Sequence, residues 1–248
     1  MDKTCIFFSP HQDDACFGCG GVIYKKIKKK EKVYIVNVCN GKNVFRIFFG
    51  IKENPTPEEV EKIRNEEDIK AMGHLGVPKA NIIFLGFDDG LSYYQRKEVE
   101  KKICELIKKI NPSEIFIPSD KDLHPDHMIT NEIVIKCLKN IKFKKSVYEY
   151  FIYLKSKIDK KNNLIKININ DAINYKKKAI KEYKSQLELF LPIQNKPFLD
   201  KKFLNNFYKT VEIFRRIDIS KNNNIFRKCY KKLKICYISS QFRKKINS

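Results

Sequence analysis

The chain has 248 residues, of which 42% are hydrophobic and 12% are aromatic, and its formal net charge is +22. This composition is typical of one globular domain and argues against an intrinsically disordered protein. No apolar stretch approaches the roughly 20 residues that span a bilayer, and the short "CIFF" after Lys3 is no signal-peptide core. We therefore expect a soluble, cytoplasmic protein.

Four short apolar runs predict buried strands at residues 4–9, 32–39, 81–87 and 113–119. Helical patterns separate these strands, and they cover residues 15–30, 56–76 and 97–110, with a fourth helix beginning near residue 128. Thr56, Pro57 and Glu59 open the second helix with the pattern of a capping box. Strands that alternate with helices predict an α/β, Rossmann-like three-layer fold with a mostly parallel sheet.

Beyond residue 145 the pattern changes. Residues 146–155 and 162–170 predict extra strands, which we interpret as antiparallel additions at an edge of the sheet, and helices follow at 171–190 and 199–217. Residues 41–55 are expected to form an irregular loop whose aromatic side chains line a pocket or cover a groove. These aromatic residues are Phe45, Phe48 and Phe49.

Much of the positive charge lies at the C-terminus. Residues 220–248 carry nine Lys or Arg and no acid, and without them a net charge of +13 remains, from 42 basic and 29 acidic residues. We divide the chain into a single domain, residues 1–219, and a basic tail, residues 220–248. Nucleic acid, anionic glycans and an anionic membrane surface all suit such a charge, so charge alone chooses no partner.

The eight cysteines are scattered, and several lie within apolar patterns. In a cytoplasmic chain they predict reduced, mostly buried thiols rather than a disulfide framework. Cys16 and Cys19 form a C-x-x-C, but no second pair follows to complete a zinc ribbon.

Chemistry-bearing residues follow two of the predicted strands. His11, Asp13 and Asp14 come directly after the first strand, and His127 comes after strand 113–119. If these strands are neighbours, His11, Asp14 and His127 converge at the carboxyl end of the sheet. Two imidazoles and one carboxylate, with a position left open for water, describe a catalytic zinc site. Asp13 would then stand beside the water, free to act as a base.

A simpler alternative assigns these residues to helix ends. Asp14 could cap the helix that follows it, and Asp126 could cap the helix that begins near residue 128. We interpret His74 as an ordinary helix residue.

The segments "SPHQDDACFGCGG" and "HPDH" resemble the signatures of the LmbE-like, or PIG-L, zinc-dependent de-N-acetylases. Further segments resemble the family in the same order, so that the likeness covers roughly residues 4–217. They are "RNEEDIKAMGHLGV" (64–77), "FLGFDDG" (84–90) and "KKKAIKEYKSQLELF" (176–190). Gln12 and Ala15 depart from the family's commoner proline and glutamate, but neither departure removes a proposed ligand or base.

The resemblance implies roles for the residues that match. His11, Asp14 and His127 would bind zinc, and Asp13 would be the general base. His124, in its protonated form, would stabilise the oxyanion or the leaving group.

The same resemblance assigns Arg64 and Asp89 to substrate binding. The alternative for Arg64 is a salt bridge to Glu67 or Asp68, and Asp89 could be a plain turn residue. Asp126 would orient one of the histidines.

The resemblance therefore predicts a zinc-dependent hydrolase that removes the acetyl group from an N-acetylated amino sugar, such as N-acetylglucosamine, or from a glycoconjugate. Fe²⁺ or Co²⁺ would suit the same ligands. One alternative is a deacetylase of a lipid-linked amino sugar, such as N-acetylglucosaminyl-phosphatidylinositol. Its basic tail would contact an anionic glycan or the inner face of the membrane. An alternative of another class is a basic nucleic-acid-binding protein, although the chain shows no reading motif.

Overall fold

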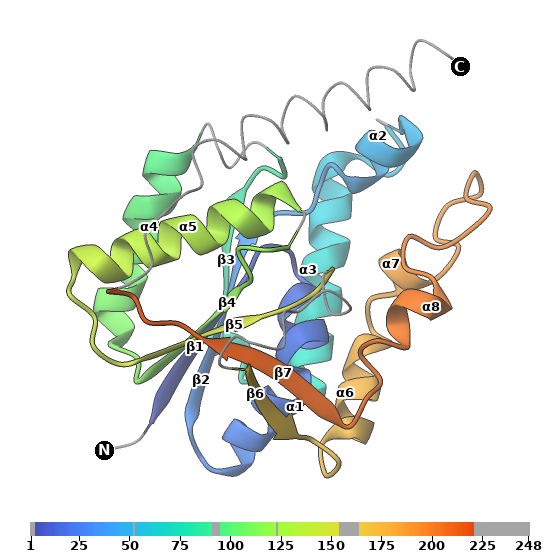
Figure 1. Cartoon of the computed structure of the whole chain (residues 1–248). Helices are drawn as coiled ribbons and strands as arrows, with labels where there is room; N and C mark the ends of the chain where they lie inside the picture. The colour runs from blue at the N-terminus through green and yellow to red at the C-terminus, as the bar shows by residue number, and fades with distance from the viewer. Residues whose placement is uncertain (1–2, 52, 91–94, 123, 154–163, 221–248) are drawn as a thin grey trace.

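The computed structural model describes residues 3–51, 53–90, 95–122, 124–153 and 164–220 (Figure 1). The tail after Ser220 and part of the two predicted edge strands lie outside the described residues. Seven strands form one sheet: β1 (Thr4–Ser9), β2 (Lys32–Cys39), β3 (Ile82–Phe87), β4 (Glu114–Pro118), β5 (Ser146–Tyr150), β6 (Leu164–Asn168) and β7 (Val211–Arg216).

The helices of the described residues fall largely between these strands. They are α1 (Asp14–Lys28), α2 (Val44–Phe49), α3 (Pro57–His74), α4 (Arg96–Ile110), α5 (Pro125–Asn140), α6 (Ile173–Ile180), α7 (Lys184–Leu187), α8 (Lys201–Leu204) and a 3₁₀ turn, η1 (Lys79–Asn81). The predicted capping box of α3 is present, because Thr56 and Glu59 each accept a backbone N–H of the other.

The strand order is β3-β2-β1-β4-β5-β7-β6, and the pairs from β3 to β5 are parallel. The chain builds outward from β1 through β2 to β3, and then returns to place β4 on the other side of β1. In such a sheet a ligand crevice opens between the two strands where the order reverses. The predicted neighbourhood of the first and fourth strands is therefore confirmed, and so is the α/β fold class.

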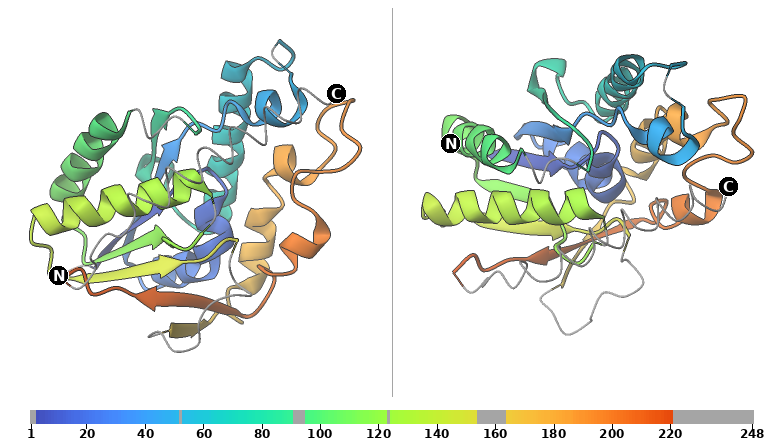
Figure 2. Two further views of the ribbon diagram at one scale, coloured as in Figure 1. Left: turned by 45° about the horizontal axis from the view of Figure 1, so that its top comes forward. Right: turned by 90° about the horizontal axis from the view of Figure 1, so that it is seen from above.

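Helices cover both faces of the sheet (Figures 1 and 2). In β1, Cys5 and Phe7 pack in the cluster that includes residues of α1, α3 and α6, while Ile6 and Phe8 pack in the cluster with α4 and α5. Alternate side chains of a strand point to opposite faces. A strand covered on both sides is consequently apolar throughout, which explains the uninterrupted "CIFF".

Several predictions for the C-terminal half are wrong. The segment predicted as a helix at 199–217 contains the short helix α8 and then β7, which pairs antiparallel with both β5 and β6. The predicted helix 171–190 is divided into α6 and α7. β5 is no edge strand, because it pairs in parallel with β4 and has β7 on its other side.

The segment 41–55 is also more regular than predicted, since it contains α2. The Phe45 ring packs against Phe190 and Phe198, with ring centroids 5.6 and 5.4 Å apart. Phe49 lies 5.1 Å from Phe198 in the same way. These aromatic side chains thus tie α2 to the segment between α7 and α8.

One cysteine pair departs from the prediction of reduced thiols. Cys104 of α4 and Cys137 of α5 form a disulfide, with Cα atoms 5.4 Å apart. The free thiols among the described residues are buried, as predicted: Cys5, Cys16, Cys19 and Cys39.

A buried ion pair from the C-terminal part of the chain makes hydrogen bonds with the backbone of α1. Lys176 Nζ donates to Glu212 Oε1 at 2.6 Å and to the carbonyl oxygen of Phe17 at 2.7 Å. The Glu212 carboxylate accepts the N–H groups of Gly21 and Val22, both at 2.9 Å. Phe17 O and Gly21 N are partners in a regular α-helix. The ion pair therefore binds both members of one backbone pair of α1, Phe17 O and Gly21 N.

Candidate active site

The predicted metal ligands meet at the carboxyl ends of β1 and β4. His11 lies in the turn after β1, Asp14 opens α1, and His127 lies in the first turn of α5. Oδ2 of Asp14 is 3.2 Å from Nδ1 of His11 and 3.1 Å from Nε2 of His127. The structure thus brings the three predicted ligands together around one carboxylate oxygen.

Two further carboxylates face the outer nitrogens of these histidines. Oδ2 of Asp126 lies 3.2 Å from Nε2 of His11, and Oδ2 of Asp122 lies 3.0 Å from Nδ1 of His127. Such carboxylates fix the orientation of metal-binding imidazoles and raise their basicity. Asp126 was predicted to orient a histidine of its own motif, but the ring nitrogen that it faces most closely is that of His11. Asp122 was missed. Its signal in the sequence is its place two residues before His124, in the same loop.

The residues present fit a divalent metal ion. Nε2 of His127 is buried and makes no hydrogen bond within the described part of the chain, although a carboxylate oxygen stands 3.1 Å away. Ligand atoms about 2.0–2.1 Å from a tetrahedral metal are about 3.3 Å from one another, close to the two distances at Asp14. The three imidazoles of His11, His124 and His127 offer another set, with nitrogens within 4.8 Å of one another.

The electrostatics of the site favour positive charge. Burial opposes ionisation of Asp14, but His127 and His11 outweigh burial and hold the pKa of Asp14 well below its usual range. Burial also opposes a charge on His127, yet Asp14 and Asp122 raise the pKa of His127 to about 9. Without a metal ion, protons on the histidines balance the carboxylates. With a metal ion, these protons are released.

His124 differs from the prediction of a protonated histidine. Burial, together with the charges of His11 and His127, lowers the pKa of His124 to about 3. A metal cation at the same place would act in the same direction. Nδ1 of His124 accepts the N–H of Asp126 at 3.3 Å. The neutral ring therefore carries its proton on Nε2, where it can donate a hydrogen bond.

Asp13 and Arg64 form a pair behind the ligands. Nη2 of Arg64 lies 3.6 Å from Oδ1 of Asp13, and Nη1 donates to the carbonyl oxygen of Gly41 at 3.2 Å. Burial raises the pKa of Asp13 although Arg64 opposes the shift. Arg64 is only 5% exposed, so its position suits orientation of Asp13.

The alternative salt bridges from Arg64 to Glu67 or Asp68 are not formed in the described structure, because both carboxylates bind other groups. Glu67 accepts the N–H and the hydroxyl of Ser185, at 2.7 and 2.6 Å. Asp68 accepts the Tyr183 hydroxyl at 2.8 Å and the Asn37 amide at 2.7 Å. The buried face of α3 is thus hydrogen-bonded to Tyr183, just before α7, and to Ser185 of α7.

Asp89 shapes the loop after β2. Its carboxylate accepts the N–H groups of Gly41 at 2.8 Å and Asn43 at 3.1 Å. Gly41 has a φ of +70°, and a Cβ there would lie 2.4 Å from Nη1 of Arg64. Only glycine allows this close approach. Asp89 is therefore more than a turn residue, and it ties the Gly41 loop to the site.

Comparison with known proteins places these observations in a family. The family model described as "PIG-L: GlcNAc-PI de-N-acetylase" matches residues 6–138, more than half of the chain. The chain belongs to the PIG-L family.

Solved structures share the fold of this PIG-L protein at low sequence identity. N,N'-diacetylchitobiose deacetylase from Pyrococcus horikoshii is 21% identical, with a TM-score of 0.68 over 92% of this chain and 88% of that one. A deacetylase of teicoplanin biosynthesis is 17% identical, with a TM-score of 0.67 over 89% and 100%. GalB, the 4-carboxy-2-hydroxymuconate hydratase from Pseudomonas putida KT2440, is 16% identical, with a TM-score of 0.66 over 90% and 99%. Because deacetylases and a hydratase share this fold, the residues of the site, and not the fold, determine the reaction.

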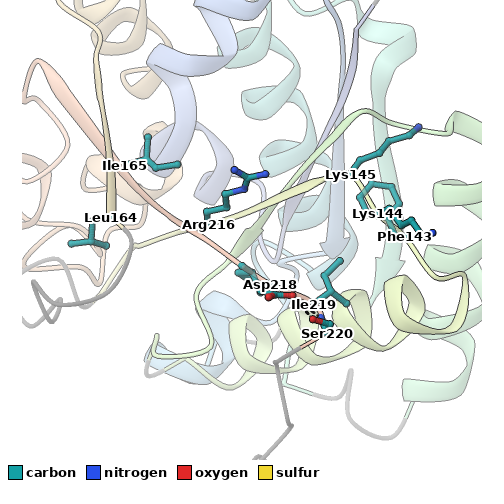
Figure 3. A pocket seen from close by; sticks show the side chains of 10 residues that line it. Phe143, Lys144, Lys145, Leu164, Ile165, Arg216, Asp218, Ile219 and Ser220 are labelled. Atoms are coloured by element: carbon teal, nitrogen blue, oxygen red, sulfur yellow. Dashed lines mark hydrogen bonds between the residues drawn. The ribbon is translucent and has the colours of Figure 1, made fainter.

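A pocket of about 750 Å³ lies at the opposite end of the sheet, between the start of β5 and the end of β7 (Figure 3). It is lined by three exposed cationic residues, Lys144, Lys145 and Arg216. The Lys145 ammonium already donates to Asn111 Oδ1 at 2.9 Å and to Pro112 O at 3.0 Å. None of the predicted site residues lines this pocket, so it is separate from the candidate active site.

We predict that Asp122→Asn weakens metal binding about 10- to 100-fold, because the change removes the charge that holds His127. Competition with a chromogenic chelator would measure this loss. Asp120→Asn is a matched control in the same loop, since Asp120 pairs with Arg215 rather than with a histidine. Equal affinities in the two variants would contradict the orienting role of Asp122.

A second prediction concerns pH and Asp68. Burial raises the pKa of Asp68 to about 7 from 3.8, so the folded state holds this proton more tightly than the unfolded state. Stability from this group is therefore greatest below about pH 4 and falls as the pH rises to about 7, by up to about 4 kcal/mol. Asp68→Asn should flatten the fall in the free energy of unfolding between about pH 4 and pH 7, measured by denaturant titration. A variant as pH-dependent as the wild type would contradict the shift.

Proposed function

We propose that this PIG-L protein is a metal-dependent N-deacetylase that hydrolyses the acetamide of an N-acetylated amino sugar or glycoconjugate. The observation that carries the proposal is the meeting of Asp14 with His11 and His127, each held by an outer carboxylate, with Asp13 alongside. The family and the fold of the deacetylases support the same chemistry.

His11, Asp14 and His127 would hold the metal ion, which we propose to be zinc, with Fe²⁺ or Co²⁺ suited to the same ligands. When bound, such an ion lowers the pKa of water and polarises the amide carbonyl. Arg64, behind Asp13, positions that carboxylate.

In the proposed reaction, Asp13 accepts a proton from the attacking water as the water oxygen bonds to the acetyl carbon. Nε2–H of neutral His124 donates to the developing oxyanion. Burial raises the pKa of Asp13, so this residue can keep the proton and deliver it to the departing nitrogen as the C–N bond breaks. The products are acetic acid and the amine, which exchange a proton to leave acetate and the ammonium form, and Asp13 returns to its ionised form.

The test combines metal content with release of amine. Tag-free protein and His127→Ala are prepared identically, analysed for bound metal, and assayed with N-acetylglucosamine and N,N'-diacetylchitobiose. We expect about one metal ion per chain and released amine in the wild type, and loss of both in the variant. Wild-type protein that binds no metal after zinc is added back would contradict the proposal.

A second candidate is a lipid-linked amino sugar as substrate. Leu189 and Ile193 are 60% and 65% exposed, and they lie in the segment between α7 and α8 that projects from the body of the protein (Figure 1). Exposed lysines flank them, including Lys184 and Lys196. Apolar side chains among lysines suit the surface of an anionic membrane. None of the helices in the described ranges combines the length and apolarity needed to cross a membrane.

Sedimentation with vesicles tests this candidate. Vesicles that contain phosphatidylinositol should bind the wild type more strongly than Leu189→Ser/Ile193→Ser, and pure phosphatidylcholine should bind neither. Equal binding of both proteins would contradict a role for this segment. The role of the basic tail, residues 220–248, stays a prediction that deletion of 221–248 would test in the same assay.

The nucleic-acid-binding alternative also stays a prediction. Metal-free protein that binds DNA or RNA, with an affinity that falls steeply with salt, would favour it.

A further inference from the structure

An exposed tyrosine stands beside the histidines of the candidate site. Tyr153 follows β5 and is 45% exposed, although most aromatic side chains in the described part of the chain are covered. Its ring centroid lies 6.1 Å from that of His124 with an interplanar angle of 19°, and 5.5 Å from that of His127. The site therefore has an aromatic wall that is open to solvent.

The backbone of Tyr153 is fixed by the carboxylate that holds His127. Oδ1 of Asp122 accepts the N–H of Tyr153 at 3.3 Å, and Oδ2 accepts the N–H of Ile152 at 3.2 Å. Oδ2 is also the atom that faces Nδ1 of His127. One carboxylate thus sets the position of the tyrosine relative to a proposed metal ligand.

The ring of Tyr153 is also in contact with aromatic residues that lead back to the core. Phe203 of α8 lies 5.8 Å from it, and Phe207 lies 5.0 Å from Phe203. Phe207 in turn packs 5.1 Å from Phe17 of α1. The exposed ring is consequently the outer end of a continuous aromatic stack, and an aromatic side chain held in this way loses little freedom when a ligand binds.

The chemistry of such a surface favours a sugar ring. The face of an aromatic ring carries partial negative charge and is apolar. A pyranose offers an apolar face of C–H groups with partial positive charge, whereas a small acyclic amide offers no comparable face. We propose that Tyr153 is a stacking platform that binds the pyranose ring of the substrate, and so selects N-acetylated sugars over acyclic N-acetyl compounds. This inference rests on the proposed deacetylase function.

The test compares three variants of the metal-loaded protein on two kinds of substrate. Tyr153→Ala removes the ring, Tyr153→Phe keeps the ring without its hydroxyl, and Tyr175→Ala is the matched control. Tyr175 is 41% exposed and stacks on Tyr24 of α1, with ring centroids 4.0 Å apart. The substrates are N-acetylglucosamine and the acyclic N-acetylethanolamine, and the readout is the rate of amine release.

For N-acetylglucosamine, Tyr153→Ala should raise KM about 5- to 10-fold, the effect of one aromatic contact, with kcat nearly unchanged. Tyr153→Phe and Tyr175→Ala should keep the wild-type KM. No variant should change kcat/KM for N-acetylethanolamine. An unchanged KM in Tyr153→Ala overturns the inference. So does a Tyr153→Phe as impaired as Tyr153→Ala, because that result would assign the effect to the phenol hydroxyl.

A binding readout separates this inference from the proposed function. Saturation-transfer NMR reports contact between the protein and the ring protons of N-acetylglucosamine without any turnover. If the wild type releases no amine, the proposed function fails, and transfer that is lost in Tyr153→Ala but kept in Tyr153→Phe still supports the platform. The inference is overturned if saturation transfer to the sugar ring is equally strong in the wild type and in Tyr153→Ala. It is also overturned if the wild type shows no transfer.

Discussion

Asp13→Asn should lower kcat for deacetylation about 10²- to 10⁴-fold, the usual contribution of a general base, while the protein keeps its metal. Asparagine has nearly the size of aspartate, but its amide cannot accept the proton of the attacking water. Arg64 Nη2 is 3.6 Å from Oδ1 of Asp13, and it can still contact the amide oxygen of the variant. The measurements are the rate of amine release and the metal content of the same sample.

Asp14→Asn is the matched control one residue away. Asp14 lies between His11 and His127, so its neutralisation should remove both the metal and the turnover. If Asp13→Asn keeps more than about a tenth of the wild-type kcat, far above the range for loss of a general base, another group is the base. If Asp13→Asn also loses the metal, Asp13 is a ligand, and the division of labour between the adjacent aspartates is wrong.

The sequence predicted the site to the extent that it located the ends of the strands that carry it. The apolar runs at β1 and β4 are buried on both faces, so their limits were easy to place, and the residues after them had to lie at one edge of the sheet. Whether the two strands were neighbours depended on long-range pairing, here Phe7 with Phe116. His11, Asp14 and His127 meet only because of that pairing.

Asp122 was missed because its role arises from tertiary contacts. Its oxygens face a ring nitrogen of His127 and two backbone N–H groups after β5. No local periodicity reports such contacts, and β5 itself was predicted at an edge of the sheet. The neutral state of His124 could not be predicted for a related reason, since its pKa is lowered by burial and by the charges of two imidazoles that the fold brings beside it.

β7 was missed because a charged residue occupies an inward position. Glu212 is 1% exposed and lies among apolar neighbours of the strand, so the apolar alternation that marks a half-buried strand is broken. Its burial is explained only by Lys176 and by the backbone of α1, both distant in sequence. The same contact predicts an effect on stability.

Lys176→Met should lower the free energy of unfolding by about 3–5 kcal/mol, because it leaves Glu212 buried without its counter-charge. Lys176 is fully buried and Glu212 nearly so. Denaturant titration would show a lower midpoint with an unchanged m-value. Lys25→Met, on α1, is the control, since Lys25 pairs with the exposed Asp171, and it should change the midpoint far less.

The double variant Lys176→Met/Glu212→Gln distinguishes lost attraction from an uncompensated charge. If the cost of Lys176→Met comes from the stranded carboxylate, neutralising Glu212 should restore much of the stability, because glutamine can still accept an N–H of α1. If the double variant is less stable than Lys176→Met, the carboxylate itself stabilises this part of α1. In that case Glu212 binds the N–H groups of Gly21 and Val22 much as a helix-capping residue does. Lys176 then mainly neutralises the buried charge of Glu212.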